Sequence, residues 1–127
     1  MSTQFAIDVK QRLVVTTFAG ENSEEEIIGL ASKIQSHPDF DPSFSEIIDC
    51  RAISTVGIST AGVGRIARRK NIFDLASLHV IVAPRDHIFG LARMGQALAD
   101  QTVPNIVVVR TMEEAYKILK LEKPGAE

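Results

Sequence analysis

The feature that most constrains the fold is the alternation of three short, predominantly apolar runs with segments of helical periodicity. The runs occupy residues 47–50, 80–83 and 106–109, each has the length of a strand, and Asp49 is the single polar residue among them. Strands buried on both faces occur in parallel sheets, where the helices that cover the sheet connect one strand to the next. The alternation therefore predicts a parallel sheet with helices packed against it.

The N-terminal part of the chain predicts a β-hairpin that precedes these units. Phe5, Ile7 and Val9 alternate with polar neighbours, and a second β-rich run over residues 13–18 is ended by Gly20. With the hairpin in front, the element order becomes ββαβαβαβα. We therefore expect an α/β fold with a mixed, mostly parallel, five-stranded sheet covered by helices.

The length and composition favour one domain. A chain of 127 residues with 45% hydrophobic content is long enough for one substantial core and too short for two. We therefore expect a single domain over residues 1–127, with a flexible tail over residues 122–127.

Two of the four helical segments begin with a capping box, in which an N-cap hydroxyl and a glutamate three residues later bond each other's backbone. Ser23 with Glu26 predicts the start of the first helix, and Thr111 with Glu114 predicts the start of the last. The first helix should end near Ser36. These motifs fix two helix starts independently of the apolar periodicity.

The other two helices have simpler caps. Ser59 or Thr60 is expected to cap the second helix and Asp86 the third. The inward positions expected from helical spacing are Val63, Ile66 and Ala67 in the second helix, and Ile88, Leu91, Ala92, Gly95 and Leu98 in the third.

Charge is distributed unevenly along the chain. The formal net charge is only −2 and aromatic residues make up 6%, which is unlike a nucleic-acid-binding surface and excludes nucleic acid as an expected partner. Residues 21–49 nevertheless carry eight acids and one base, whereas residues 51–93 carry seven bases and two acids. We interpret this asymmetry first as solubility and partner orientation, with an anionic ligand or partner as the alternative.

Three basic residues in the second helix, Arg65, Arg68 and Arg69, have the spacing of one helical face. The simplest interpretation is a solvated face near the helix C-terminus, where the helix dipole favours positive charge. The alternative is a patch for an acidic partner.

The expected binding region is the edge where parallel strands end. Right-handed crossovers place the carboxyl ends of parallel strands at one edge, so the loops that begin at Arg51, Pro84 and Arg110 should converge. The candidate ligand-binding residues there are Asp49, Arg51, Arg85, Asp86, His87, Gly90 and Arg93.

Each of these candidates has a structural alternative. Asp49 and Arg51 point to the same face of a strand and either orient a ligand or pair with one another. Arg85 and Arg93, together with helix N-termini, would suit a carboxylate or phosphate. Against this, Asp86 is the expected cap and Arg93 is explained equally by packing or an ion pair.

No catalytic, metal or cofactor site is expected. Asp86 and His87 are adjacent, and no serine or cysteine is tied to them by spacing. The histidines His37, His79 and His87 lack the paired spacing of a metal site. The single cysteine, Cys50, excludes an internal disulfide and is interpreted as a small core residue.

The sequence favours a cytoplasmic protein. The first residues lack the basic start and long apolar run of a secretory signal, and no segment reaches the roughly 18 apolar residues that span a bilayer. A single thiol fits a reducing compartment. We expect neither secretion nor a membrane span.

Four motifs spread along the chain match the pattern of a known family. They are Arg12-Leu13-Val14 before Gly20, the loop over residues 38–44, Asp49 with Arg51, and Gly90-Leu91-Ala92-Arg93-Met94. With these motifs the chain resembles, over nearly its whole length, the small bacterial SpoIIAA-like proteins of STAS and SEC14 type. The resemblance implies the STAS fold of anti-sigma-factor antagonists.

In phosphorylated antagonists of that family, an Asp-Ser-Ser-Gly turn stands at the start of the helix after the third strand. The corresponding residues here are Ile58-Ser59-Thr60-Ala61-Gly62, which lack the aspartate. The resemblance makes Ser59 and Thr60 weak phosphorylation candidates, whereas helix capping is the structural alternative.

Three functions are carried forward from the sequence. The first is a non-enzymatic regulatory or partner-docking module, the second a small-ligand or lipid carrier of SEC14-like type, and the third a cofactor-free enzyme that uses His87 or Asp86. The partner would be a protein or a small anionic or apolar ligand, and a homodimer is left open. A deep apolar cavity would favour the carrier, and a filled core with a charged edge would favour the docking module.

Overall fold

The computed structural model describes residues 3–56, 59–99 and 101–121. The tail predicted over residues 122–127 lies outside the described residues.

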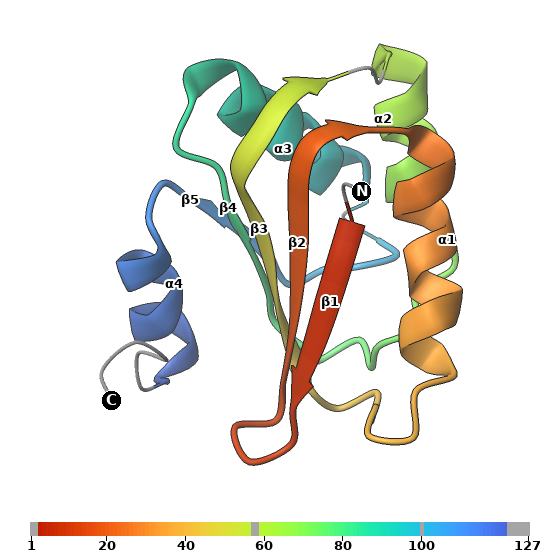
Figure 1. Ribbon diagram of the computed structural model, residues 1–127, viewed down its shortest axis with the longest axis vertical. Helices are drawn as coiled ribbons and strands as arrows, with labels where there is room; N and C mark the ends of the chain where they lie inside the picture. Colours follow the sequence, from red (N-terminus) through yellow and green to blue (C-terminus); the bar gives the residue numbers. More distant parts are fainter. Residues whose placement is uncertain (1–2, 57–58, 100, 122–127) are drawn as a thin grey trace.

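The described strands form one mixed five-stranded sheet in the order β1-β2-β3-β4-β5 (Figure 1). Their bounds are β1 Thr3–Asp8, β2 Leu13–Asn22, β3 Ser45–Val56, β4 His79–Val82 and β5 Ile106–Val109. β1 is antiparallel to β2, and every other neighbouring pair is parallel. The predicted α/β class, element order ββαβαβαβα and mixed sheet are confirmed.

The hairpin strand β2 is longer than predicted. Gly20 does not end it: β2 continues to Asn22, and the pairing with β3 shifts between Gly20 and Glu21. Gly20 has a φ of +66°, a left-handed conformation that glycine adopts without steric penalty. The glycine therefore bends the strand at a bulge instead of terminating it.

β3 also extends beyond the predicted strand over residues 47–50. It pairs with β4 only from Glu46 to Asp49, but its pairing with β2 continues to Val56. The second half of β2 explains the extension, because its backbone supplies hydrogen bonds to β3 beyond the point where β4 ends. The second half of β3 therefore has a strand neighbour on one side alone. Arg51 consequently lies inside β3, and the loop predicted to begin there is wrong.

Three helices cover one face of the sheet and one covers the other (Figure 1). Their bounds are α1 Glu24–Gln35, α2 Thr60–Ala67, α3 Asp86–Leu98 and α4 Met112–Leu119. α1, α2 and α3 pack over the first face, whereas α4 packs against β3, β4 and β5 on the second. The two faces therefore have separate cores.

The helix starts follow the predicted caps in three cases of four. Both capping boxes are present, and the Ser59 hydroxyl caps α2 by accepting from the Gly62 amide at 3.0 Å. The prediction that Asp86 caps α3 is wrong: Arg85 is the N-cap residue and Asp86 is the first helical residue. The Asp86 side chain is 93% exposed and is bound by Arg110 instead.

The predicted inner face of α3 needs one correction. Leu98 is 41% exposed, whereas the next residue, Ala99, is 2% exposed. Ala99 stands eleven positions after Ile88, close to three full turns at 3.6 residues per turn. Ala99 therefore continues the apolar stripe of the helix, and Leu98 lies off it.

Candidate functional site

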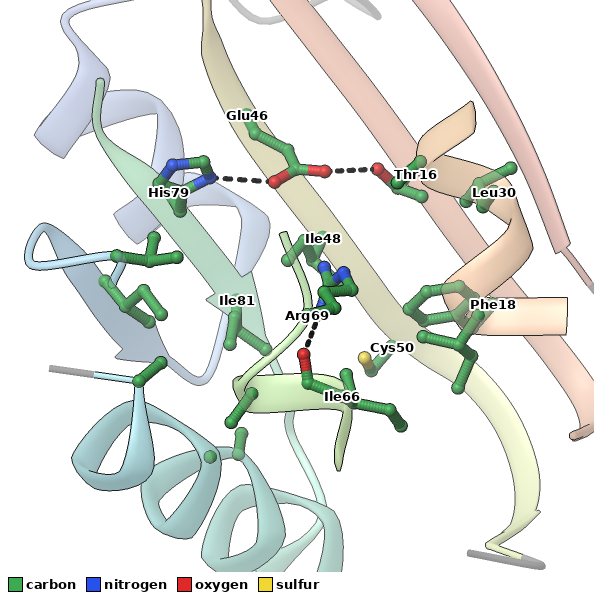
Figure 2. Close-up of a pocket in the computed structure, with 18 of the residues that line it drawn as sticks. Thr16, Phe18, Leu30, Glu46, Ile48, Cys50, Ile66, Arg69, His79 and Ile81 are labelled. Atoms are coloured by element: carbon green, nitrogen blue, oxygen red, sulfur yellow. Dashed lines mark hydrogen bonds and ion pairs between the residues drawn. The ribbon is translucent and has the colours of Figure 1, made fainter. Parts of the chain in front are cut away.

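A cavity of about 210 Å³ lies between the sheet and the layer formed by α1, α2 and α3 (Figure 2). Alternate residues of the strands form its floor, including Phe18 of β2, Ile48 and Cys50 of β3, and Ile81 of β4. Because successive strand residues point to opposite faces, the predicted site residue Asp49 faces away from the cavity, toward α4.

The helices above this floor present several small residues to the cavity. They are Ala31 of α1, Ala67 of α2, Ala92 and Gly95 of α3, and Ala99, which follows α3. Side chains of this length do not reach the floor from the helix axes, so the space between the layers is left open. These small residues contribute to the open space, and larger side chains of the same helices, such as Ile27, Leu30 and Ile88, complete the lining.

One end of the cavity carries a buried polar network that joins three strands. The Thr16 hydroxyl donates to Glu46 Oε2 at 2.8 Å, and Glu46 Oε1 lies 2.8 Å from His79 Nδ1 (Figure 2). Glu46 and His79 are register partners in β3 and β4. All three side chains are buried, so each oxygen of the carboxylate has one partner in place of water.

The far side of the His79 ring lacks such a partner. Its Nε2 is buried and makes no hydrogen bond with any described residue. The ring packs edge-on against Phe73, with 4.7 Å between ring centroids. The tautomer of the ring decides which of its two nitrogens donates and which accepts.

Arg69 is the second charged residue of the cavity. Figure 2 shows its guanidinium between Glu46 and the end of α2, where Nη1 donates to the Ile66 carbonyl at 2.6 Å. Desolvation lowers the pKa of Arg69, and the nearby Glu46 charge raises it. The side chain is therefore half-buried and charged, yet within the described residues it enters no ion pair.

The predicted solvated row of three arginines is wrong for Arg69. α2 ends at Ala67, and Arg68 is already its C-cap, so Arg69 has left the helical spacing that would place it beside Arg65. Arg65 instead binds Glu24 of α1, with Nη2 2.8 Å from Oε1, and Arg68 is exposed.

Cys50 is a buried wall residue of the cavity, as expected for a core thiol. Burial, followed by the adjacent Asp49 charge, raises the pKa of its thiol to about 12. The thiolate is the reactive form of cysteine, so this residue is held in its unreactive state.

Two of the predicted site residues pair with one another on the α4 face. Arg51 Nε and Nη2 donate to the two carboxylate oxygens of Asp49, at 3.0 and 2.9 Å. This bidentate contact raises the pKa of Arg51. Asp49 also accepts from the Arg51 backbone amide at 3.0 Å, so the ion-pair alternative considered from the sequence is present in the structure.

The remaining candidates gather at the start of α3. Arg110 Nη1 binds Asp86 at 2.6 Å and the Pro84 carbonyl at 3.1 Å, and its guanidinium lies 4.0 Å from the centre of the Phe89 ring. Arg110 thereby joins the loops after β4 and β5, as the topology predicted. The sequence analysis did not single out its side chain.

The other predicted binding residues of this region, Arg85, His87, Gly90 and Arg93, are exposed. Arg85, His87 and Arg93 have no hydrogen bond or ion pair to another part of the described chain. None of the seven predicted ligand-binding residues lines the cavity. An anion site at this edge therefore stays a prediction, as does phosphorylation of the exposed Ser59 and Thr60.

The polar residues of the cavity were not predicted from the sequence, although two of them carried a signal. Glu46 and His79 each immediately precede an apolar run, at residues 47–50 and 80–83. Parallel strands paired in register place two such residues side by side. Arg69 had no comparable signal, because its position depends on where α2 ends.

Within residues 3–56, 59–99 and 101–121, no group of three or more His, Cys, Asp or Glu side chains has the arrangement of a metal site. None of the described helices is both long and apolar enough to cross a membrane. The sequence matches no family model, and no curated protein is significantly similar to it.

Proposed function

We propose that this protein binds a small, largely apolar molecule in the cavity between the sheet and α1, α2 and α3. The observation that carries the proposal is an apolar space of about 210 Å³ with charged residues at one end. Protein interiors are close-packed, and voids larger than a water molecule are few. An engineered cavity of about 150 Å³ already holds benzene.

The size of the space limits the ligand. Benzene has six non-hydrogen atoms and fits a cavity of about 150 Å³, so by proportion this cavity accommodates about eight. A polar group of the ligand would extend toward the charged end. An occupant of this size would cover apolar side chains that line the cavity.

Among the functions predicted from the sequence, the cavity favours the small-ligand carrier over the docking module. The proposal includes the finer family assignment, a STAS-like domain of SpoIIAA-like type, which the element order and the mixed sheet support. The SEC14-type side of that resemblance agrees with a carrier. The proposed role is binding without catalysis.

The experiment is a fluorine NMR titration of the protein with trifluorotoluene, a neutral apolar probe. The test variant is Ala92→Leu, which places a larger side chain in the cavity. The matched control is Ala97→Leu, the same change at an exposed position of the same helix. We expect saturable binding to wild type and Ala97→Leu, and binding at least about tenfold weaker to Ala92→Leu, because overpacking removes the space.

Thermal unfolding of each variant distinguishes a filled cavity from a misfolded protein. A folded Ala92→Leu protein that binds the probe as tightly as Ala97→Leu would contradict the proposal. So would a wild-type protein that shows no saturable binding.

A further inference from the structure

We propose that the polar group of the ligand is a carboxylate bound by Arg69, so that the occupant is a short aliphatic or aromatic acid. This inference rests on the proposed function and specifies its ligand class. It follows from Arg69, a charged residue that lines the cavity, is half-buried and has no ion-pair partner among the described residues.

The guanidinium of Arg69 has hydrogen-bonding capacity to spare. A guanidinium carries five N–H donors in a planar fork, and within the described part of the chain Arg69 uses them for one contact, to the Ile66 carbonyl. Desolvation already lowers its pKa, which indicates that water does not fully replace the missing partners. A carboxylate is the small group whose two oxygens match this fork.

Glu46 does not take this role, although it is the nearest opposite charge. Its two oxygens contact Thr16 and His79, each at 2.8 Å, and among the described residues Arg69 donates to the Ile66 carbonyl and not to this carboxylate. Glu46 raises the pKa of Arg69 through space but makes direct contact only with its strand neighbours. Figure 2 draws one contact of the Arg69 guanidinium, to the Ile66 carbonyl, which leaves its other N–H donors without a partner among the described residues.

The charge of the cavity also favours one negative group. Glu46, Arg69 and the exposed Lys70 line it, and the formal charges of these three side chains sum to plus one. A single carboxylate balances this charge. A neutral alcohol would displace water from Arg69 without balancing its charge or matching its N–H donors, which is unfavourable.

The test compares two ligands of matched chain length, octanoate and n-octanol, as competitors of bound trifluorotoluene. Octanoate has the more strongly hydrated head group, so an apolar cavity alone would favour n-octanol. We expect wild-type protein to release the probe at an octanoate concentration at least about tenfold below that of n-octanol, the effect of a charge-assisted hydrogen bond.

Arg69→Met removes the guanidinium and keeps a similar apolar length, and Arg68→Met is the control at the adjacent exposed residue. We expect Arg69→Met to abolish the preference for octanoate while n-octanol competes as before. We expect Arg68→Met to behave like wild type. If Arg69→Met fails to fold, Arg69→Lys keeps the charge without the fork and should lose most of the preference.

Two results would overturn the carboxylate assignment alone: n-octanol competing as well as octanoate on wild type, or the preference persisting without the arginine. In both cases trifluorotoluene still binds, and the proposed function stands. Failure of wild-type protein to bind trifluorotoluene would overturn both proposals together.

Discussion

The two faces of the sheet differ in how completely they are packed. On the α4 face, Leu13, Ile47, Val80 and Val82 form a core with almost no exposure, closed by Ala115 of a single helix. The opposite face is covered by three helices and still contains a cavity of about 210 Å³. The number of helices that cover a face of the sheet therefore does not decide how completely that face is packed. Open space for a ligand depends on the packing.

The difference originates in side-chain size and charge. The α4 face packs aliphatic residues closely against one another, whereas the cavity face combines large aliphatic residues with several alanines and a glycine and also holds a buried Glu46. β4 takes part in both arrangements, because Val80 and Val82 point to α4 and Ile81 points to the cavity. Neighbouring residues of one strand thus belong to the filled core and to the cavity floor.

The largest effect is expected from a charge on the filled face. Val80→Asp should prevent folding, since an unpaired buried carboxylate costs several kcal/mol against a total stability of about 5 to 15. Ile81→Asp should be milder, because its carboxylate enters a cavity that already holds Arg69. Circular dichroism melts of both variants measure this. Equal loss of folding would break the contrast between the two faces.

The next effect concerns the polar end of the cavity. Glu46→Ala should lower the free energy of unfolding by about 3 kcal/mol, because Thr16, His79 and Arg69 lose their common acceptor or countercharge. Glu46→Gln keeps hydrogen bonds to both neighbours and should cost less, about 1 kcal/mol. Urea unfolding curves supply both values. A neutral effect of Glu46→Ala would show that the network contributes nothing to stability.

Matched caps on the two faces sharpen the comparison. Ser59→Ala at α2 and Thr111→Ala at α4 each remove a hydroxyl that accepts a backbone N–H, and each should cost about 1 kcal/mol. Only Ser59→Ala should also weaken trifluorotoluene binding, because α2 supplies part of the cavity wall. Unfolding curves and probe titrations of both variants decide this. Weaker binding to Thr111→Ala as well would argue that the faces are coupled.

The smallest effect is a pH dependence that arises on the cavity wall. Burial raises the pKa of Cys50 from 9.0 to about 12, so the unfolded chain releases the thiol proton first as the pH rises. Its contribution to stability is intact below pH 9 and declines between pH 9 and about 12, reaching a loss of about 1 kcal/mol near pH 10. The measurement compares wild type with Cys50→Ala at about pH 8 and about pH 10; identical pH profiles would contradict the shift.

The sequence predicted the architecture much better than the cavity. The apolar runs and the two capping boxes depend on residues close together in the chain, so strand order and most helix starts followed from local patterns. The cavity depends on Ala31, Ala67, Ala92 and Gly95, small residues from three helices, and their joint effect becomes visible only once the helices are packed. To predict that Arg69 faces the cavity, one would need the last residue of α2 to within two positions. The spacing of apolar residues does not locate a helix end that closely.

The Thr16, Glu46 and His79 network has a consequence for how the chain reaches its native state. Its two contacts join residues 30 and 33 positions apart, so each closes a long loop that local helix formation does not provide. Sliding any of the three strands by one residue would bury the carboxylate without its partners. We therefore expect misaligned intermediates to be less stable than the aligned sheet, so that the polar residues at one end of the cavity also favour the correct strand alignment during folding.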